Sequence, residues 1–199
     1  MSDVADIELS WAGEFDEELS AGVHRVVHDV VAAGGAVGYL TPPGRATTDK
    51  WLAETLDAVS AGDAALALAT VDGRIEAIGC WRRSAWEPFA HSAEVQKVMA
   101  HPDARGLGLG RVVVAALLDR ARGADLETLT LGVRGNNHGA LELYEDFGFT
   151  VYGRLPNVVE VGNLRFDSVQ LYLVLGHGPE VQLRGSLPGG PGSSPRRRG

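Results

Sequence analysis

The fold is decided by the stretch Val98-Met-Ala-His-Pro-Asp-Ala-Arg-Gly-Leu-Gly-Leu-Gly-Arg111, which joins a strand-like segment to an apolar run. Apolar residues from Leu109 to Leu117 recur at helical spacing, so we expect a helix that begins at the glycines and ends at Gly123. A strand, a glycine-rich turn and a helix start bring backbone N–H groups and the positive end of a helix dipole together. Such a turn suits a phosphate or pyrophosphate group.

The glycine-rich turn does not match two well-known phosphate-binding loops. Arg105 adds a positive charge at its mouth, and Gly106, Gly108 and Gly110 allow an anion to approach the backbone closely. A nucleotide-binding P-loop needs Lys and then a hydroxyl residue directly after its last glycine, and this stretch lacks both. A dinucleotide fingerprint that starts at Gly106 would need its third glycine where Arg111 stands. A tight turn without any ligand is the plain alternative.

Length and composition indicate an ordinary globular domain. The chain has 199 residues, of which 45% are hydrophobic and 22% charged, enough for one domain with a sizeable core. No apolar run reaches the roughly 18 residues of a membrane-spanning helix, and the acidic start is unlike a secretory signal. The single Cys80 excludes an internal disulfide and a multi-cysteine metal site. We therefore expect a cytoplasmic protein with no membrane partner.

Charge is unevenly distributed along the chain. The net charge is −8, and the four Arg and one Glu from His177 onward contribute +3, so the remainder carries −11 (−8 minus 3). An acidic body argues against nucleic acid as a partner. Residues 177–199 are rich in Gly, Pro and Ser, which predicts a disordered tail behind a single domain at 1–176.

Hydrophobic periodicity and turn residues predict an alternation of strands and helices. Strands are expected at 7–11, 64–71, 74–83, 93–100, 126–133, 149–155 and 166–175. Helices are expected at 16–33, from 47–49 to the stop at Gly62, at 109–123 and at 140–147. The Asp72-Gly73 pair between two apolar runs indicates a hairpin. The resulting order, βααβββαβαββ, is an α+β fold with a largely antiparallel sheet.

Two motifs in this order resemble a known family. The spacing Arg-x-x-Gly-x-Gly, met by Arg105, Gly108 and Gly110, is similar to the pyrophosphate motif of the GNAT superfamily of acyl-CoA N-acyltransferases. The block Asn137-x-x-Ala-x-x-x-Tyr144, followed by Gly-Phe, resembles the family's second motif, at the right separation. The resemblance covers roughly residues 5 to 175. It implies the GNAT fold, in which the two central strands splay apart beside the glycine turn.

Two further segments resemble one branch of that superfamily. The segments 33–40 and 91–102 look like the tabtoxin-resistance-type branch, whose substrates are small amines. The resemblance implies acetyl-CoA as co-substrate and a small-molecule or protein amine as acceptor. It leaves open whether the protein is a monomer or a homodimer.

The resemblance also implies where acetyl-CoA lies. The pantetheine amides would pair with the backbone of Val98, Met99 and Ala100, as an added strand pairs with a sheet edge. The pyrophosphate would rest on the N–H groups of the loop, and Asn137 would bond the pantetheine arm. The residues expected to contact the cofactor are Val98, Met99, Ala100, Arg105, Gly106, Leu107, Gly108, Leu109, Gly110, Arg111, Asn137 and Tyr144. Without the motif, ordinary ladder pairing would explain the strand residues, and helix capping would explain Asn137.

The chemistry implied is attack of a neutral amine on a thioester carbonyl. Tyr144 stands at the position of the family's general acid, which would protonate the departing thiolate. Glu94 lies on the strand that leads to the gap between the two splayed strands, which we call the slot. Alternation places it on the same face as Gln96 and Val98, so it could accept the amine proton directly or through water. An exposed charge paired with Arg82 or Arg83 is the alternative for Glu94. Some relatives carry an acid near the position of Gly132, and its absence here favours Glu94 or water as the base.

Acceptor contacts and metal ligands are less clearly indicated. Aromatic side chains suit an amine, so the candidate substrate residues are His28, Trp81, Trp86 and His91. His24 and His28 lie four residues apart on a helix but lack a third ligand, so we expect no metal. Two functions remain open: an acetyl-CoA-dependent N-acetyltransferase, or a GNAT-like protein that binds or senses acyl-CoA without turnover.

Overall fold

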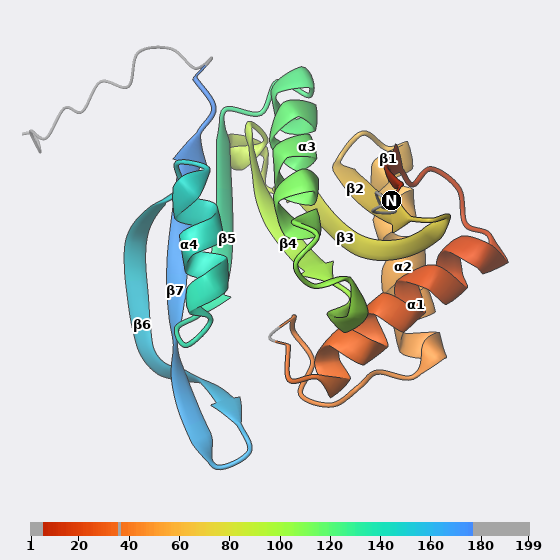
Figure 1. The fold of residues 1–199 in the computed structure, drawn as a ribbon. Helices are drawn as coiled ribbons and strands as arrows, with labels where there is room; N and C mark the ends of the chain where they lie inside the picture. The colour runs from red at the N-terminus through yellow and green to blue at the C-terminus, as the bar shows by residue number, and fades with distance from the viewer. Residues whose placement is uncertain (1–5, 36, 177–199) are drawn as a thin grey trace, which may run out of the picture.

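A computed structural model describes residues 6–35 and 37–176 of the chain. A seven-stranded mixed sheet runs in the order β1-β2-β3-β4-β5-β7-β6 (Figure 1). The strands are β1 Ile7–Trp11, β2 Ala64–Val71, β3 Arg74–Arg83, β4 Ser92–Ala100, β5 Thr128–Arg134, β6 Thr150–Val161 and β7 Leu164–Val174. The helices are α1 Glu17–Ala32, α2 Arg45–Ser60, α3 Leu109–Gly123 and α4 His138–Asp146, with short 3-10 turns η1 Glu87–Phe89 and η2 Pro102–Ala104. The predicted element order and the α+β class are confirmed, and the tail predicted at 177–199 lies outside the described residues.

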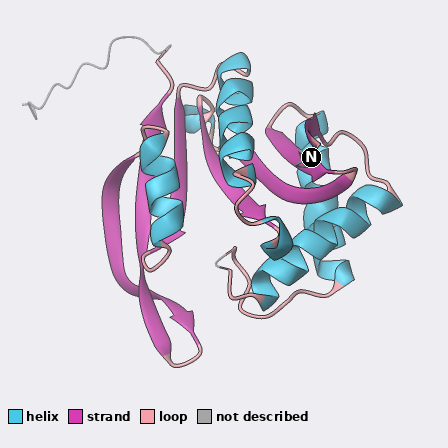
Figure 2. Cartoon of the chain, in the orientation of Figure 1, coloured by secondary structure: helices cyan, strands magenta, loops and turns pink. Residues whose placement is uncertain are grey.

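Helices cover both faces of the sheet (Figure 2). Side chains of α3 and α4 pack on one face in a core cluster that includes Val113, Leu117 and Tyr144. Side chains of α1 and α2 pack on the other face, where Val23 and Leu52 are completely buried. The apolar periodicity of each helix therefore predicts which side it buries.

Two elements have different bounds from those predicted. Helix α2 begins at Arg45, because Gly44 serves as the N-cap and the Thr48 hydroxyl, inside the first turn, donates to the Arg45 carbonyl at 2.8 Å. Strands β6 and β7 are longer than expected and extend to the turn at Gly162. Their pairing shifts register between Leu155 and Val159, which interrupts the alternation on which the sequence prediction depended.

A bulge in β4 changes which side chains face the slot. Lys97 has a φ of 53°, and the pairing between β3 and β4 shifts by one residue at this point. Gln96 pairs with Cys80, which packs in the core cluster on the α1 face, whereas Val98 packs against the core cluster on the α3 face. The prediction that Glu94, Gln96 and Val98 share one face is therefore wrong for Val98, because one extra residue reverses the alternation.

The two central strands separate where the glycine turn begins. β4 pairs in parallel with β5 only from Ser92 to Glu94, opposite residues 128–130. Beyond Glu94 the two strands diverge, while β4 continues to pair with β3 as far as Ala100 (Figure 1). The predicted splayed pair is confirmed, and it leaves one edge of β4 open.

Gly79 is expected to be required for packing of α3 on the sheet. A Cβ atom at this position would lie 2.5 Å from Val113 Cγ1 and 3.0 Å from Val98 Cγ2. We expect Gly79→Ala to lower the free energy of unfolding by about 1–3 kcal/mol, because the helix must move away. Denaturant unfolding checks this, with Gly123→Ala as control, because no heavy atom lies within 4 Å of a Cβ added there. Equal stability of the two variants would contradict this packing argument.

Candidate active site

The space between the splayed strands is a cavity of about 310 Å³. One wall is β4 from Val95 to Ala100. The other consists of residues 132–134 of β5 together with Asn137 and two residues of α4, Ala140 and Tyr144. Lys97, Arg105 and Arg134 line this cavity, and no Asp or Glu does so among the residues that the structure describes. A cationic cavity in a chain of net charge −8 suits an anionic ligand.

The glycine loop presents its backbone N–H groups at the end of this cavity. Gly106 and Gly108 have φ values of 86° and 72°, a region that glycine adopts without strain. Gly108 is the N-cap of α3, and within residues 6–35 and 37–176 no acceptor is recorded for the N–H groups from Gly106 to Gly110. Unpaired N–H groups at the N-terminus of a fifteen-residue helix fit a pyrophosphate.

Two arginines flank the loop and differ in their contacts. Arg105 lines the cavity. Arg111 instead pairs with Asp146, and its guanidinium lies 6.0 Å from the Phe147 ring centre, so it joins α3 to α4. Its backbone N–H donates to the Gly108 carbonyl. The structure therefore gives the Arg111 side chain a role between helices.

The open edge of β4 carries the three strand residues expected to bind pantetheine. Met99 and Ala100 pair with Ile78 and Ala77 of β3 on one side, and no strand pairs with them on the β5 side within the described chain. Backbone groups on an open strand edge can bond the amides of an extended ligand. The sequence-based ladder interpretation thus accounts for only one of the two edges.

Asn137 and Tyr144 form the wall opposite this edge. The Asn137 side chain caps α4 by accepting from the Ala140 N–H at 3.3 Å, and the residue also lines the cavity. Tyr144 is 7% exposed and packs against Phe149 with ring centres 5.5 Å apart. Burial raises the pKa of Tyr144, so its hydroxyl stays protonated at neutral pH and can donate a hydrogen bond.

Glu94 does not line the cavity. It lies on the same strand, on the α1 face, and its Oε2 accepts from Gln96 Nε2 at 2.6 Å. Gln96 itself lines the cavity, so this amide stands between Glu94 and the cavity. Arg82 and Arg83 bond backbone carbonyls, and neither forms an ion pair with Glu94 in the part of the chain described. Near Gly132, where an acid is missing, the neutral Gln170 side chain lies 3.0 Å from the position of an added Cβ.

The four aromatic residues expected to contact the acceptor lie outside this cavity. Trp81 is 2% exposed in the core cluster beneath α3, so this expectation is wrong for Trp81. Trp86 is 74% exposed and packs on Phe89 in the loop before β4. His91 is exposed at the other end of β4, and His28 pairs with Asp29 on α1. Their positions depend on tertiary packing, which aromatic character alone does not reveal.

Two cations near the acceptor side were not singled out by the sequence. Lys97 donates to the Val37 carbonyl at 2.5 Å and lies 4.2 Å from the Tyr39 ring centre, and burial lowers the pKa of its ammonium group. Arg134 lies 5.2 Å from the Phe166 ring centre and donates to Asn136 at 2.7 Å. Arg134 follows a predicted strand directly before the asparagine motif, a signal that could have identified it. The bulge that orients Lys97 has no comparable signal.

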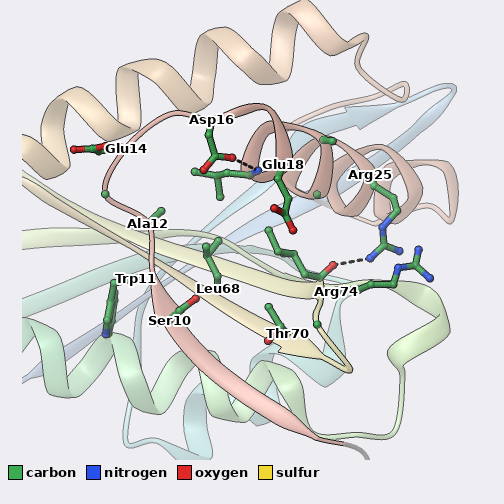
Figure 3. Close-up of a pocket in the computed structure, with 16 residues that line it drawn as sticks. Ser10, Trp11, Ala12, Glu14, Asp16, Glu18, Arg25, Leu68, Thr70 and Arg74 are labelled. Carbon is green, nitrogen blue, oxygen red and sulfur yellow. Dashed lines mark hydrogen bonds between the residues drawn. The ribbon is translucent and has the colours of Figure 1, made fainter.

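A second cavity, of about 600 Å³, lies away from these motifs. Figure 3 shows it between β1, the first half of α1 and the β2–β3 hairpin, with Glu18 and Arg74 on its rim. Arg25 crosses one wall and donates to the Ile75 carbonyl at 2.6 Å. None of the residues that the sequence singled out for the cofactor or the acceptor lines it, so the splayed strands remain the candidate site.

Comparison with known proteins agrees with this geometry. A sequence model of the Acetyltransferase (GNAT) family matches residues 24–149, which include β4, the glycine loop, α3, β5 and α4. This chain belongs to the GNAT family of acetyltransferases. The predicted family is therefore confirmed.

Two relatives of known activity share part of the chain. L-amino acid N-acyltransferase MnaT of Escherichia coli is 35% identical over 80 residues, 40% of this chain and 45% of that protein. L-methionine sulfoximine/L-methionine sulfone acetyltransferase of Salmonella typhimurium is 33% identical over 97 residues, 47% of this chain and 55% of that protein. This GNAT chain thus spans about half the length of each relative. The second relative supports the predicted branch of small-amine enzymes.

A solved structure supports the fold. The GNAT superfamily phosphinothricin acetyltransferase (Pat) from Sinorhizobium meliloti, solved in complex with AcCoA, matches with a TM-score of 0.72 at 16% identity, over 86% of this chain and 90% of that one. For the described residues, no helix is long and apolar enough to cross a membrane, and no group of three or more His, Cys, Asp or Glu could hold a metal ion.

Proposed function

We propose that this GNAT protein transfers the acetyl group of acetyl-CoA to the primary amine of a small molecule that carries a carboxylate. The observation that carries the proposal is the slot cavity, which combines three cationic side chains, an open strand edge and a buried tyrosine. The N–H groups of the glycine loop and Arg105 would hold the pyrophosphate. The backbone of Val98, Met99 and Ala100 would hold the pantetheine amides.

The proposed reaction is direct attack on the thioester. The amine nitrogen forms a bond to the acetyl carbonyl carbon, and the bond from that carbon to sulfur breaks. Tyr144 lies on the wall opposite β4 and would donate its proton to the departing thiolate. The amine would lose its proton to solvent beside Gln96, with Glu94 behind that amide as a relay that returns the proton to bulk solvent. Tyr144 then regains a proton from solvent, so that the net proton moves from amine to thiol.

Arg134 and Lys97 suggest the acceptor class. They stand on opposite walls of the cavity, on β5 and β4, where an acceptor amine would approach. Guanidinium and ammonium groups bind carboxylates through charge-assisted hydrogen bonds. The relatives named for L-amino acids and L-methionine sulfoximine support an amino-acid-like acceptor.

The function is tested by release of CoA thiol from acetyl-CoA in the presence of a panel of amines. The panel should include amino acids, their decarboxylated analogues and a peptide amine. We expect turnover with carboxylate-bearing amines. Tight binding of acetyl-CoA with no turnover on any amine would favour the acyl-CoA sensor instead.

Arg134→Met is expected to raise KM for an amino-acid acceptor about tenfold or more, because a hydrogen bond to a charged group is lost. Methionine keeps an apolar stem beside Phe166, so packing is disturbed little. KM for acetyl-CoA should stay within about twofold, since Arg105 and the glycine loop hold the pyrophosphate. Steady-state kinetics check this, with the decarboxylated amine as matched substrate. An equal loss with both amines would contradict carboxylate recognition by Arg134.

A further inference from the structure

A cluster of ionisable side chains surrounds the buried His101 and Glu76, directly before the cofactor loop in the chain. His101, the residue after β4, is 5% exposed, and its Nε2 lies 2.9 Å from Asp29 Oδ2 of α1. Its Nδ1 lies 3.6 Å from Oε2 of Glu76, which is 8% exposed on β3. Arg25 of α1 donates to the other Glu76 oxygen at 2.8 Å. The proposed chemistry uses none of these groups.

His101 fastens the turn that leads into the cofactor loop. Its ring Nδ1 accepts from the Asp103 N–H at 3.2 Å, which caps the turn η2. Its backbone carbonyl accepts from the Ala104 N–H at 3.0 Å, and its own N–H donates to the Glu76 carbonyl at 2.7 Å. Arg105 and Gly106 follow at once, so the orientation of the loop N–H groups depends on this turn.

The contacts of the ring fit one tautomer of a neutral imidazole. Nδ1 is an acceptor for Asp103 N–H, so the proton of a neutral ring lies on Nε2 and is donated to Asp29. Hydrogen bonds from His28 and then from His101 hold the pKa of Asp29 below its usual range, which keeps this acceptor ionised. Both ring nitrogens are therefore satisfied in the neutral form.

Glu76 offers a second partner for the same nitrogen. Its Oε2 is buried and lacks a hydrogen-bond partner within the described chain. A buried carboxylate oxygen without a partner is costly and is expected to attract any nearby donor. Protonation of the His101 ring creates such a donor on Nδ1 and removes the acceptor of the Asp103 N–H.

The charged groups around the ring come from three elements. Asp29 and Arg25 face it from α1, with His28 behind Asp29. Glu76 faces it from β3, and Asp103 from η2 at 3.7 Å. Among the described residues, Arg25 bonds Oε1 of Glu76, and Arg74 Nε lies 3.9 Å from the same oxygen. Carboxylates from all three elements therefore lie close enough to stabilise a protonated ring.

We propose that His101 is a positioning residue for the cofactor loop, and that the unpaired oxygen of Glu76 makes this positioning depend on pH. With a neutral ring, His101 anchors the turn through Asp103. With a protonated ring, Nδ1–H turns to Glu76, the turn is released, and affinity for acetyl-CoA drops. This inference rests on the proposed function.

The test is the Kd of acetyl-CoA, measured by calorimetry at about pH 8 and about pH 6. Wild type is compared with His101→Asn, in which the amide oxygen can still accept from Asp103 N–H but cannot titrate, and with His101→Ala. The CoA 3′-phosphate titrates in the same range, so the comparison between variants, not the wild-type slope, is decisive. Glu76→Gln keeps an amide oxygen for Arg25 and removes the competing carboxylate.

We expect the Kd of wild type to rise about three- to tenfold more than that of His101→Asn between the two pH values. His101→Ala should bind about tenfold more weakly than wild type at the higher pH, with rescue by His101→Asn, and should approach the wild-type Kd at the lower pH. Glu76→Gln should have a smaller slope than wild type, which preserves the test if a His101 variant fails to fold. Equal slopes in wild type, His101→Asn and Glu76→Gln would overturn this inference alone. No binding of acetyl-CoA to wild type at either pH would overturn it together with the proposed function.

Discussion

Tyr144→Phe is expected to lower kcat about 100-fold while leaving the Kd of acetyl-CoA nearly unchanged. The substitution removes only the hydroxyl, and a general acid contributes about 100-fold or more to such reactions. The ring remains packed against Phe149, so the fold and the cavity wall should be retained. Thiol-release kinetics and calorimetry on the same preparation separate the two constants.

The pH dependence gives a second view of the same residue. Burial raises the pKa of Tyr144, so the hydroxyl remains a donor throughout the range in which acceptor amines lose their proton. We therefore expect kcat/KM to rise with pH as the ammonium deprotonates, without a fall across the usual tyrosine range. Tyr172→Phe, on β7 away from the cavity, is the control. A Tyr144→Phe enzyme as active as this control would show that solvent protonates the thiolate.

Gly108→Val is expected to raise the Kd of acetyl-CoA about 100-fold. The residue has a φ of 72° at the N-cap of α3, a conformation that a β-branched side chain adopts only with strain. Valine would also occupy the approach to the loop N–H groups that should hold the pyrophosphate. Calorimetry with acetyl-CoA measures the loss.

Gly62→Val separates strain from ligand binding. Gly62 has a φ of 81° and, like Gly108, no heavy atom within 4 Å of an added Cβ, but it follows α2, outside the cavity. Both variants should lose stability by a similar amount, because both impose the same backbone strain. Only Gly108→Val should lose affinity. Similar affinities in the two variants would contradict the assignment of the pyrophosphate to this loop.

The glycine loop and the helices that flank it could be predicted from sequence because their signals are local. The glycine loop, the start of α3 and the capping residue Asn137 depend on short-range spacing and backbone conformation. Tyr144 is identified from the resemblance of residues 137–149 to the family's second motif. Neighbouring residues determine each of these features, so it can be predicted without knowledge of the tertiary contacts.

The surroundings of Lys97, Trp81 and His101 could not be predicted, because they depend on contacts between distant segments. The bulge at Lys97 reverses the strand alternation and turns Val98 to the other face. The residue types around Lys97 do not indicate a bulge. Trp81 has the same aromatic character as a binding-site residue, yet its position under α3 buries it in the core. His101 looks like an ordinary residue before a proline until β3 and α1 bring Glu76 and Asp29 to it.

The central claim is acetyl transfer to nitrogen within the cavity between β4 and β5. The most direct measurement uses acetyl-CoA labelled in the acetyl group, an amino-acid acceptor, and mass spectrometry of the acceptor alongside quantification of free thiol. We predict that each thiol released is matched by one labelled acetyl group on the amine nitrogen, and that Tyr144→Phe slows both equally. Thiol release without labelled acceptor, or no binding of acetyl-CoA at all, would contradict the proposed function.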